Sequence, residues 1–292
     1  MPPQVSIIGY SRCRLGESPV WDPDLQSLFW VDSVAPAVWS YDPATGVQVA
    51  IPAPDLVGSI VLGAPGTLIA GLRDAISRLD LASGTFSPIL TPPGLTAVER
   101  LNDGKTDRRG CFLTGSLVPA GVHPPPGKLF RFAPGRAPEV LVEGVEISNA
   151  ICFSPGGDRL YFADSLRMAI WSYAYDPETG ALGPRETLID TTPLGSAPDG
   201  ATVDADGRIW VALVQAGQIA CVSPEGRVEQ RIDMPVPFPS CPAFGGEALD
   251  ILYVTAIANS GGRLVSDHPD AGRLMAIEGL GAAGIAETRC RL

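Results

Sequence analysis

The stretch SAPDGATVDADGRIWVAL, residues 196–213, combines an acidic residue, a short strand pattern, a turn and a strand of bulky apolar residues. The DADGR turn beside alternating apolar residues is typical of a β-hairpin. An EF-hand calcium loop is excluded, because counting from Asp204 the sixth and twelfth positions hold isoleucine and glutamine instead of glycine and glutamate. We therefore expect Asp204 and Asp206 to shape a turn, which leaves Asp199 as the candidate for chemistry.

The same unit recurs six times with a period of about 45 residues, which is the sequence signature of a repeat architecture. Its middle strands read LFWVDS (28–33), LIAGLR (68–73), CFLTGS (111–116), LYFADS (160–165), IWVALV (209–214) and LYVTAI (252–257). Third and fourth strand patterns ending in Pro, Gly, Asp or Ser turns follow most of them. Four antiparallel strands per unit predict an all-β fold, a six-bladed β-propeller, formed by residues 1–292 as one domain.

Composition agrees with many short strands and excludes several kinds of partner. The 292 residues include 33 Gly and 29 Pro, and the formal net charge of −11 comes without any basic run. We therefore expect no nucleic-acid and no membrane partner, because phosphate binding needs clustered Lys and Arg and a membrane span needs about 18 apolar residues. We expect a cytoplasmic protein, a monomer or weak homo-oligomer, with its six dispersed cysteines as buried free thiols.

Alignment of the six units gives one equivalent opening residue per blade. These residues are Glu17, Ser59, Asn102, Asn149, Asp199 and Cys241, separated by 42, 43, 47, 50 and 42 residues. Because the first strand of each propeller blade lies innermost, we expect the openings to converge at one mouth of the central channel. Four of them carry a carboxylate or an amide, so the sequence predicts a polar cluster at that mouth.

Such a cluster needs a counter-charge, and the sequence offers few basic residues nearby. Carboxylate and amide oxygens suit Ca²⁺, Mg²⁺ or Mn²⁺, and two carboxylates can also hold Zn²⁺ or Fe²⁺. We expect one divalent metal ion of undetermined identity. The alternative left open is that these side chains only cap strands and accept hydrogen bonds from loop amides.

Five segments together resemble the regucalcin/gluconolactonase family, also called the senescence-marker-protein family. They are GESPVW (16–21), RLNDGK (100–105), ISNAICFSPGGDRLYFADS (147–165), PDGATVDADGRIWVA (198–212) and CPAFGGEALDILYVT (241–255). The resemblance extends from about residue 12 to the C-terminus. It implies a divalent metal held by Glu17, Asn149 and Asp199, with Arg100 and Asn102 of RLNDGK contacting substrate.

The resemblance also implies a reaction, the hydrolysis of a sugar (aldono)lactone to the free aldonic acid in sugar-acid catabolism. A metal ion would polarise the ester, and Asp199 is the candidate general base that accepts a proton from the attacking water. A Ser-His-Asp hydrolase is disfavoured, because no G-x-S-x-G motif is present and both histidines, His123 and His268, lie beside proline in expected loops. Some family members carry a substrate-binding acid just after the strand that here reads CFLTGSL, whereas this chain continues VPAGVHPPPG.

Two other functions stay open at this point, a noncatalytic calcium-binding regulatory propeller and a metal-dependent esterase or phosphotriesterase. The sequence leaves open which sugar lactone is opened, and whether residues 4–9 or 284–292 close the ring as the last outer strand. We expect loops 117–127 and 258–273 to lie on the face of the opening residues and to shape substrate selectivity. Loss of Asp204, as a turn residue, should cost about 1 kcal/mol or less.

Overall fold

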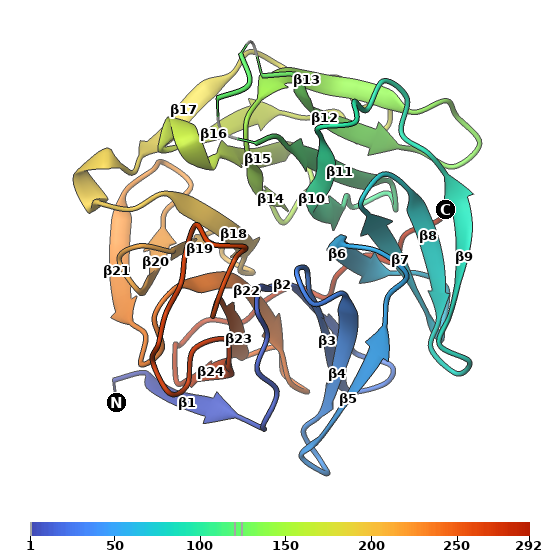
Figure 1. Cartoon of the computed structure of the whole chain (residues 1–292). Coiled ribbons are helices and arrows are strands. Elements are labelled where there is room, and N and C mark those ends of the chain that lie inside the picture. The colour runs from blue at the N-terminus through green and yellow to red at the C-terminus, as the bar shows by residue number, and fades with distance from the viewer. Residues whose placement is uncertain (1, 120, 124) are drawn as a thin grey trace.

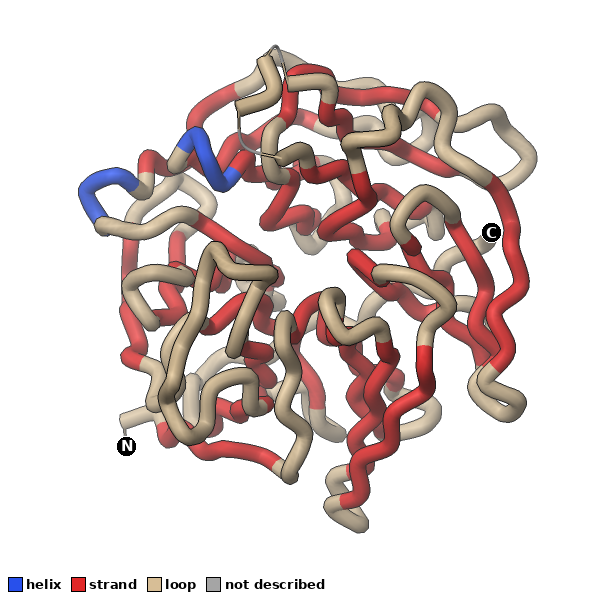
Figure 2. The backbone as a smooth tube through the Cα atoms, viewed as in Figure 1, coloured by secondary structure: helices blue, strands red, loops and turns tan. Residues whose placement is uncertain are grey.

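A computed structural model describes residues 2–119, 121–123 and 125–292. Its strands form six four-stranded antiparallel sheets arranged in a ring (Figures 1 and 2). The strands, sheet by sheet, are β2 (Gly16–Asp22), β3 (Ser27–Asp32), β4 (Ala37–Asp42) and β5 (Val47–Pro52); β6 (Val57–Leu62), β7 (Thr67–Leu72), β8 (Ile76–Asp80) and β9 (Thr85–Leu90); β10 (Arg100–Thr106), β11 (Phe112–Leu117), β12 (Gly127–Phe132) and β13 (Glu139–Val145); β14 (Ser148–Phe153), β15 (Arg159–Asp164), β16 (Ala169–Ala174) and β17 (Glu186–Asp190); β18 (Pro198–Val203), β19 (Ile209–Leu213), β20 (Gln218–Val222) and β21 (Val228–Asp233); and β22 (Pro239–Gly245), β23 (Ile251–Ala256), β24 (Leu274–Glu278) and β1 (Gln4–Ile8). Two short 3₁₀ helices, η1 (Ser165–Arg167) and η2 (Thr192–Leu194), follow β15 and β17.

The predicted six-bladed β-propeller is confirmed. The first strand of each sheet lies at the centre of the ring and the fourth at its outside (Figure 1). Burial follows this order: every residue of β18 is buried, whereas β21 of the same sheet is mostly exposed. Aliphatic and aromatic side chains of neighbouring sheets pack together, as where Trp210 of β19 meets Phe244 of β22 edge to face. The interface between blades is therefore the hydrophobic core.

The N-terminal segment closes the ring. β1 pairs antiparallel with β24 from Gln4↔Glu278 to Ile8↔Leu274, so the sixth sheet takes its outer strand from the start of the chain. Residues 284–292, the other candidate for the last outer strand, form no strand of this sheet. The two ends of the chain are thereby both fixed to the ring, one by strand pairing and one by crossing contacts.

The C-terminal segment runs across the ring behind its centre and ends beside β8 (Figure 1). Glu287 pairs with Lys105 of β10 at 2.9 Å, and Arg289 pairs with Asp22 of β2 at 2.8 Å. The backbone N–H of Cys290 donates to the Leu62 carbonyl at 2.6 Å. These contacts connect three blades at the end of the channel opposite the mouth.

All six inner strands carry a register shift at or next to their opening residue. The shifts fall between Glu17 and Val20 in β2, Val57 and Ser59 in β6, Leu101 and Gly104 in β10, Asn149 and Cys152 in β14, Pro198 and Ala201 in β18, and Pro239 and Pro242 in β22. A β-bulge bends a strand and re-aims its side chains, which turns the opening residues toward the channel. In two blades the residue after the opening, Ser18 (φ 50°) or Ala150 (φ 52°), adopts the left-handed region at a cost of about 1–3 kcal/mol each.

The six cysteines are free and buried, as predicted. No helix in the described part of the chain is long and apolar enough to span a membrane.

Asp204→Ala is expected to lower the free energy of unfolding by about 2–4 kcal/mol, more than the sequence suggested. Asp204 is fully buried, and its carboxylate accepts hydrogen bonds from Arg208 Nε at 2.8 Å and from Trp210 Nε1 at 2.9 Å. Its loss leaves a buried indole N–H unpaired. Urea denaturation of this variant beside Asp206→Ala, whose side chain is 75% exposed, provides the test. An equal loss of unfolding free energy in the two variants would contradict the structural role of the Asp204 carboxylate.

Candidate active site

A cavity of about 370 Å³ opens at one mouth of the central channel. All five residues that the sequence selected for chemistry line it, namely Glu17, Arg100, Asn102, Asn149 and Asp199. They come from four blades through β2, β10, β14 and β18. The remaining two opening residues lie deeper: Ser59 is fully buried, and Cys241 lines a second, smaller cavity. The four opening residues with a carboxylate or amide therefore line one cavity, and Ser59 and Cys241 do not.

Two of these residues are carboxylates that line the same cavity, Glu17 half-buried and Asp199 buried. Burial raises the pKa of Glu17 well above its usual value, and the Asp199 carboxylate raises it further. Burial likewise raises the pKa of Asp199 to about 8, with the Asp103 carboxylate adding to the effect. Neither Glu17 nor Asp199 forms an ion pair within 4 Å of a cationic side chain in the part of the chain that the structure describes. Neither carboxylate therefore has a cationic side chain in direct contact, although the charge of Arg100 lowers the pKa of Glu17 and that of Arg263 lowers the pKa of Asp199.

A chain of hydrogen bonds orients the amides beside them. Arg100 Nη1 donates to Asn102 Oδ1 at 2.8 Å, and Asn102 Nδ2 donates to Asn149 Oδ1 at 3.2 Å. Asn149 Nδ2 donates to Ser165 Oγ at 2.8 Å, and Ser165 in turn donates to the Pro198 carbonyl at 2.8 Å. Asn149 Oδ1 accepts one hydrogen bond, so one of its two lone pairs remains free.

The residues present fit a divalent cation. Two carboxylates that form no ion pair with any described residue and one amide oxygen with a free lone pair make a hard oxygen donor set. No group of three His, Cys, Asp or Glu side chains among the described residues is placed to hold a metal. The predicted set of Glu17, Asn149 and Asp199 differs from such a group because its third donor is an amide, whose oxygen is also a calcium ligand.

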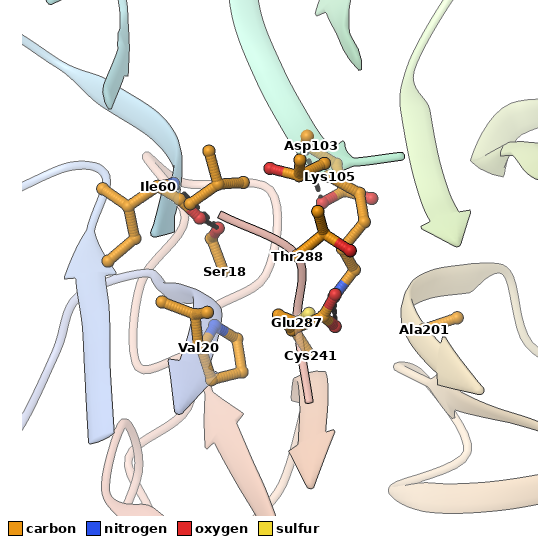
Figure 3. Close-up of a pocket in the computed structure, with 13 residues that line it drawn as sticks. Ser18, Val20, Ile60, Asp103, Lys105, Ala201, Cys241, Glu287 and Thr288 are labelled. Carbon is orange, nitrogen blue, oxygen red and sulfur yellow. Dashed lines mark hydrogen bonds and ion pairs between the residues drawn. The ribbon is translucent and has the colours of Figure 1, made fainter. Parts of the chain in front are cut away.

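Beneath the carboxylates lies the second cavity, of about 10 Å³, which is room for about one water molecule. Figure 3 shows its lining, with Asp103 and Lys105 from β10 and with Glu287 and Thr288 from the C-terminal segment. The carboxylate of Asp103 accepts hydrogen bonds from the Gly104 and Ile151 N–H groups at 2.8 and 3.0 Å. Burial nevertheless raises the pKa of Asp103 to about 6. Sequence reasoning assigned no role to Asp103, although it stands next to Asn102.

Lys105 carries the positive charge in this lower part of the channel. Burial alone lowers its pKa, but the Glu287 carboxylate at 2.9 Å outweighs that effect and the pKa is raised overall. The C-terminal segment therefore supplies the partner that keeps a buried lysine charged. No repeat pattern marks Glu287, so this contact could not be predicted from the sequence.

Of the two loops predicted to shape the site, 258–273 contributes several residues to the cavity lining and 117–127 contributes Leu117. Between β23 and β24, residues Ser260, Arg263 and Leu264 line the cavity. Between β11 and β12, residues 120 and 124 of the predicted loop 117–127 lie outside the described residues, and Leu117 lines the cavity. Neither histidine lines it. The cavity rim is otherwise aliphatic over much of its length, with Leu15, Ile147, Leu166, Val214 and Ile257.

Residues 15–258 match the model of the SMP-30/gluconolactonase/LRE-like region. Regucalcin from Gallus gallus is 31% identical over 288 residues, covering 97% of this chain and 96% of that protein. The pentonolactonase XacC from Haloferax volcanii is 33% identical over 255 residues, covering 86% and 84%. The 6-deoxy-6-sulfogluconolactonase from Pseudomonas putida is 32% identical over 265 residues, covering 90% of each.

A solved structure shares the whole architecture. The calcium-binding protein regucalcin from Agrobacterium tumefaciens superposes with a TM-score of 0.90 at 25% identity, covering 98% of this chain and 97% of that one. The relatives of this chain thus include proteins named as lactonases and proteins named as regucalcins.

Proposed function

The chain belongs to the SMP-30/gluconolactonase/LRE-like family, and from this we propose that it is a metal-dependent hydrolase that opens a sugar lactone to the free aldonic acid. The observation that carries the proposal is the pair of carboxylates, Glu17 and Asp199, which line one cavity and form no ion pair with any residue that the structure describes. Relatives named pentonolactonase and 6-deoxy-6-sulfogluconolactonase support the reaction class. The calcium-binding relative of known structure supports a divalent ion.

Glu17, Asn149 and Asp199 would hold the ion from three different blades. Two carboxylates balance the charge of a divalent cation, and three protein donors leave coordination positions open. When bound, the ion supplies polarisation of the ester carbonyl and stabilises the negative charge that develops on its oxygen. Ser165 acts through Asn149, because the hydrogen bond between them fixes which amide atom faces the cavity.

Asp199 is the residue best placed to accept a proton from the attacking water. It accepts no hydrogen bond from any residue that the structure describes, so its oxygens are available to the cavity. A positioned carboxylate of this kind contributes about 10²–10⁴-fold to a hydrolytic step.

Arg100 and Asn102 would hold the substrate over Asp199. Of the five N–H groups of a guanidinium, Arg100 uses those on Nη1 for Asn102 Oδ1 and the Leu101 carbonyl. The N–H groups on Nε and Nη2 remain for lactone oxygens. Asn102 donates to the Ser148 carbonyl and to Asn149 Oδ1, which fixes its own Oδ1 as the acceptor that orients Arg100. The free donors of the pair are therefore those of the guanidinium, held in a pre-ordered position.

The proposed function is tested with a substrate panel under defined metals. Pentono- and hexonolactones, an aryl acetate and an organophosphate are each incubated with protein loaded with Ca²⁺, Mg²⁺, Mn²⁺, Zn²⁺ or Fe²⁺, and spontaneous hydrolysis is subtracted. We expect at least one sugar lactone to exceed the other two substrate classes by about 100-fold or more in kcat/KM. A preference for the aryl ester or the organophosphate would replace the lactonase by an esterase or phosphotriesterase.

A second outcome concerns regulation. Protein that binds Ca²⁺ but opens no lactone faster than buffer would overturn the proposed enzyme and leave the noncatalytic calcium-binding propeller, the reading that the regucalcin relatives also allow. Calorimetric titration of Ca²⁺ into the same preparation separates this outcome from a protein that has lost its fold.

A further inference from the structure

The outer wall of the active-site cavity carries a guanidinium that the proposed reaction does not use. Arg263, in the loop between β23 and β24, lines the cavity and is exposed. A second arginine of the same loop, Arg273, pairs with Asp270 at 3.2 Å. Arg263, by contrast, joins no ion pair or hydrogen bond with any residue that the structure describes. Its charge is therefore available at the entrance to the site.

The loop presents Arg263 from a defined turn. Asn259 and Val265 form an isolated β-bridge, and the Leu264 N–H donates to Ser260 Oγ at 2.9 Å. The Asn259 side chain accepts from both glycine N–H groups before Arg263, at 3.0 and 2.9 Å. At its base the loop is bound to Arg14, whose carbonyl accepts from the Asn259 N–H at 2.8 Å. In Figure 1 this loop, in red, reaches toward the centre of the ring.

The balance of charge around the cavity indicates what Arg263 faces. Four charged side chains line it: Glu17, Asp199, Arg100 and Arg263. Once the two carboxylates are matched by a divalent cation, the two guanidinium groups remain uncompensated. Arg263 lines the same cavity as the other three, so it can contact a molecule bound there. An uncharged sugar lactone would leave this double positive charge unmatched.

We propose that Arg263 binds an anionic group on the substrate, remote from the ester, so that the preferred substrate is an acidic sugar lactone. This inference rests on the proposed lactonase function and specifies its substrate class. A carboxylate, a sulfonate or a phosphate on the last carbon of the sugar has the required charge, and arginine binds each of them through paired N–H groups. The whole chain carries a net charge of −11, so a local cation is needed to attract an anion to this mouth.

Matched lactones that differ only in charge provide the test. Glucaro-1,4-lactone and glucono-1,4-lactone share the ring and differ at the last carbon, carboxylate against hydroxymethyl. We expect wild-type kcat/KM to favour the carboxylate by about tenfold or more, and Arg263→Gln to bring that ratio to about one. Arg263→Lys should keep part of the preference, and Arg273→Gln, a control in the same loop, should keep all of it. Phosphorylated and sulfonated hexonolactones, each against its neutral parent, identify which anion is preferred.

A binding measurement separates failure of this inference from failure of the proposed function. Glucarate and gluconate, which cannot react, are titrated into the metal-loaded protein by calorimetry. We expect glucarate to bind about tenfold more tightly than gluconate, and Arg263→Gln to remove the difference. If glucarate bound more tightly than gluconate but no lactone were opened, the proposed lactonase function would be overturned and the anion-binding role of Arg263 would stand. A wild-type ratio of one in both measurements, or a ratio unchanged in Arg263→Gln, would overturn the role of Arg263.

Discussion

Asp199→Asn is expected to lower kcat for lactone opening by about 10³-fold or more. The substitution removes one negative donor from the candidate metal set and, at the same time, the group that accepts the proton from water. Loss of the base alone is worth about 10²–10⁴. Asparagine keeps the shape of the side chain, so the cavity should change little in volume. The measurement is kcat under saturating lactone at a fixed metal concentration.

The fold of this variant should be intact, because Asp199 accepts no hydrogen bond from the described residues and faces the cavity. Its melting temperature without metal should equal or exceed that of the wild type, since the substitution removes an uncompensated buried charge. Asp206→Asn, in the exposed turn that follows the same inner strand, is the matched control and should retain full activity. A variant at Asp199 with more than about a tenth of wild-type kcat would contradict its role as the base.

The fold could be predicted from the sequence because each blade repeats one physical pattern. Middle strands such as IWVALV are buried on both faces between neighbouring sheets, so they read as continuous apolar runs that are easy to align. Their alignment then fixed the inner strands and their openings. Since the inner strands converge by geometry, the four polar openings Glu17, Asn102, Asn149 and Asp199 could be placed at one mouth without knowing any contact. Arg100 was assigned only through the family resemblance.

The rest of the site could not be predicted, because it depends on features that do not repeat. The bulge in every inner strand interrupts the alternation of side chains, and the left-handed residues Ser18 and Ala150 that follow Glu17 and Asn149 are not glycines, so no local signal marks them. Arg263 lies in an irregular loop, where no repeat constrains its position. A sequence reading detects the ring but not what its loops place over the mouth.

Metal removal gives the second large effect. We expect chelation to abolish lactone opening and also to reverse the usual pH dependence of stability. In the metal-free protein the pKa of Asp199 is raised to about 8, and that of Glu17 is raised as well. The unfolded chain has both carboxyls near 4. Between these values the folded protein binds more protons than the unfolded chain, so the free energy of unfolding falls as the pH rises.

The melting temperature of chelated protein should therefore fall by about 5 °C or more from pH 5 to pH 8. A bound divalent cation favours the ionised carboxylates and removes this loss, so the rise in melting temperature on adding Ca²⁺ should be larger at pH 8 than at pH 5. Asp199→Asn and Glu17→Gln should each flatten the chelated profile and shrink the response to Ca²⁺. If the response to Ca²⁺ were the same at both pH values, or if chelated protein became more stable toward pH 8, the two carboxylates would not be the group that the ion binds.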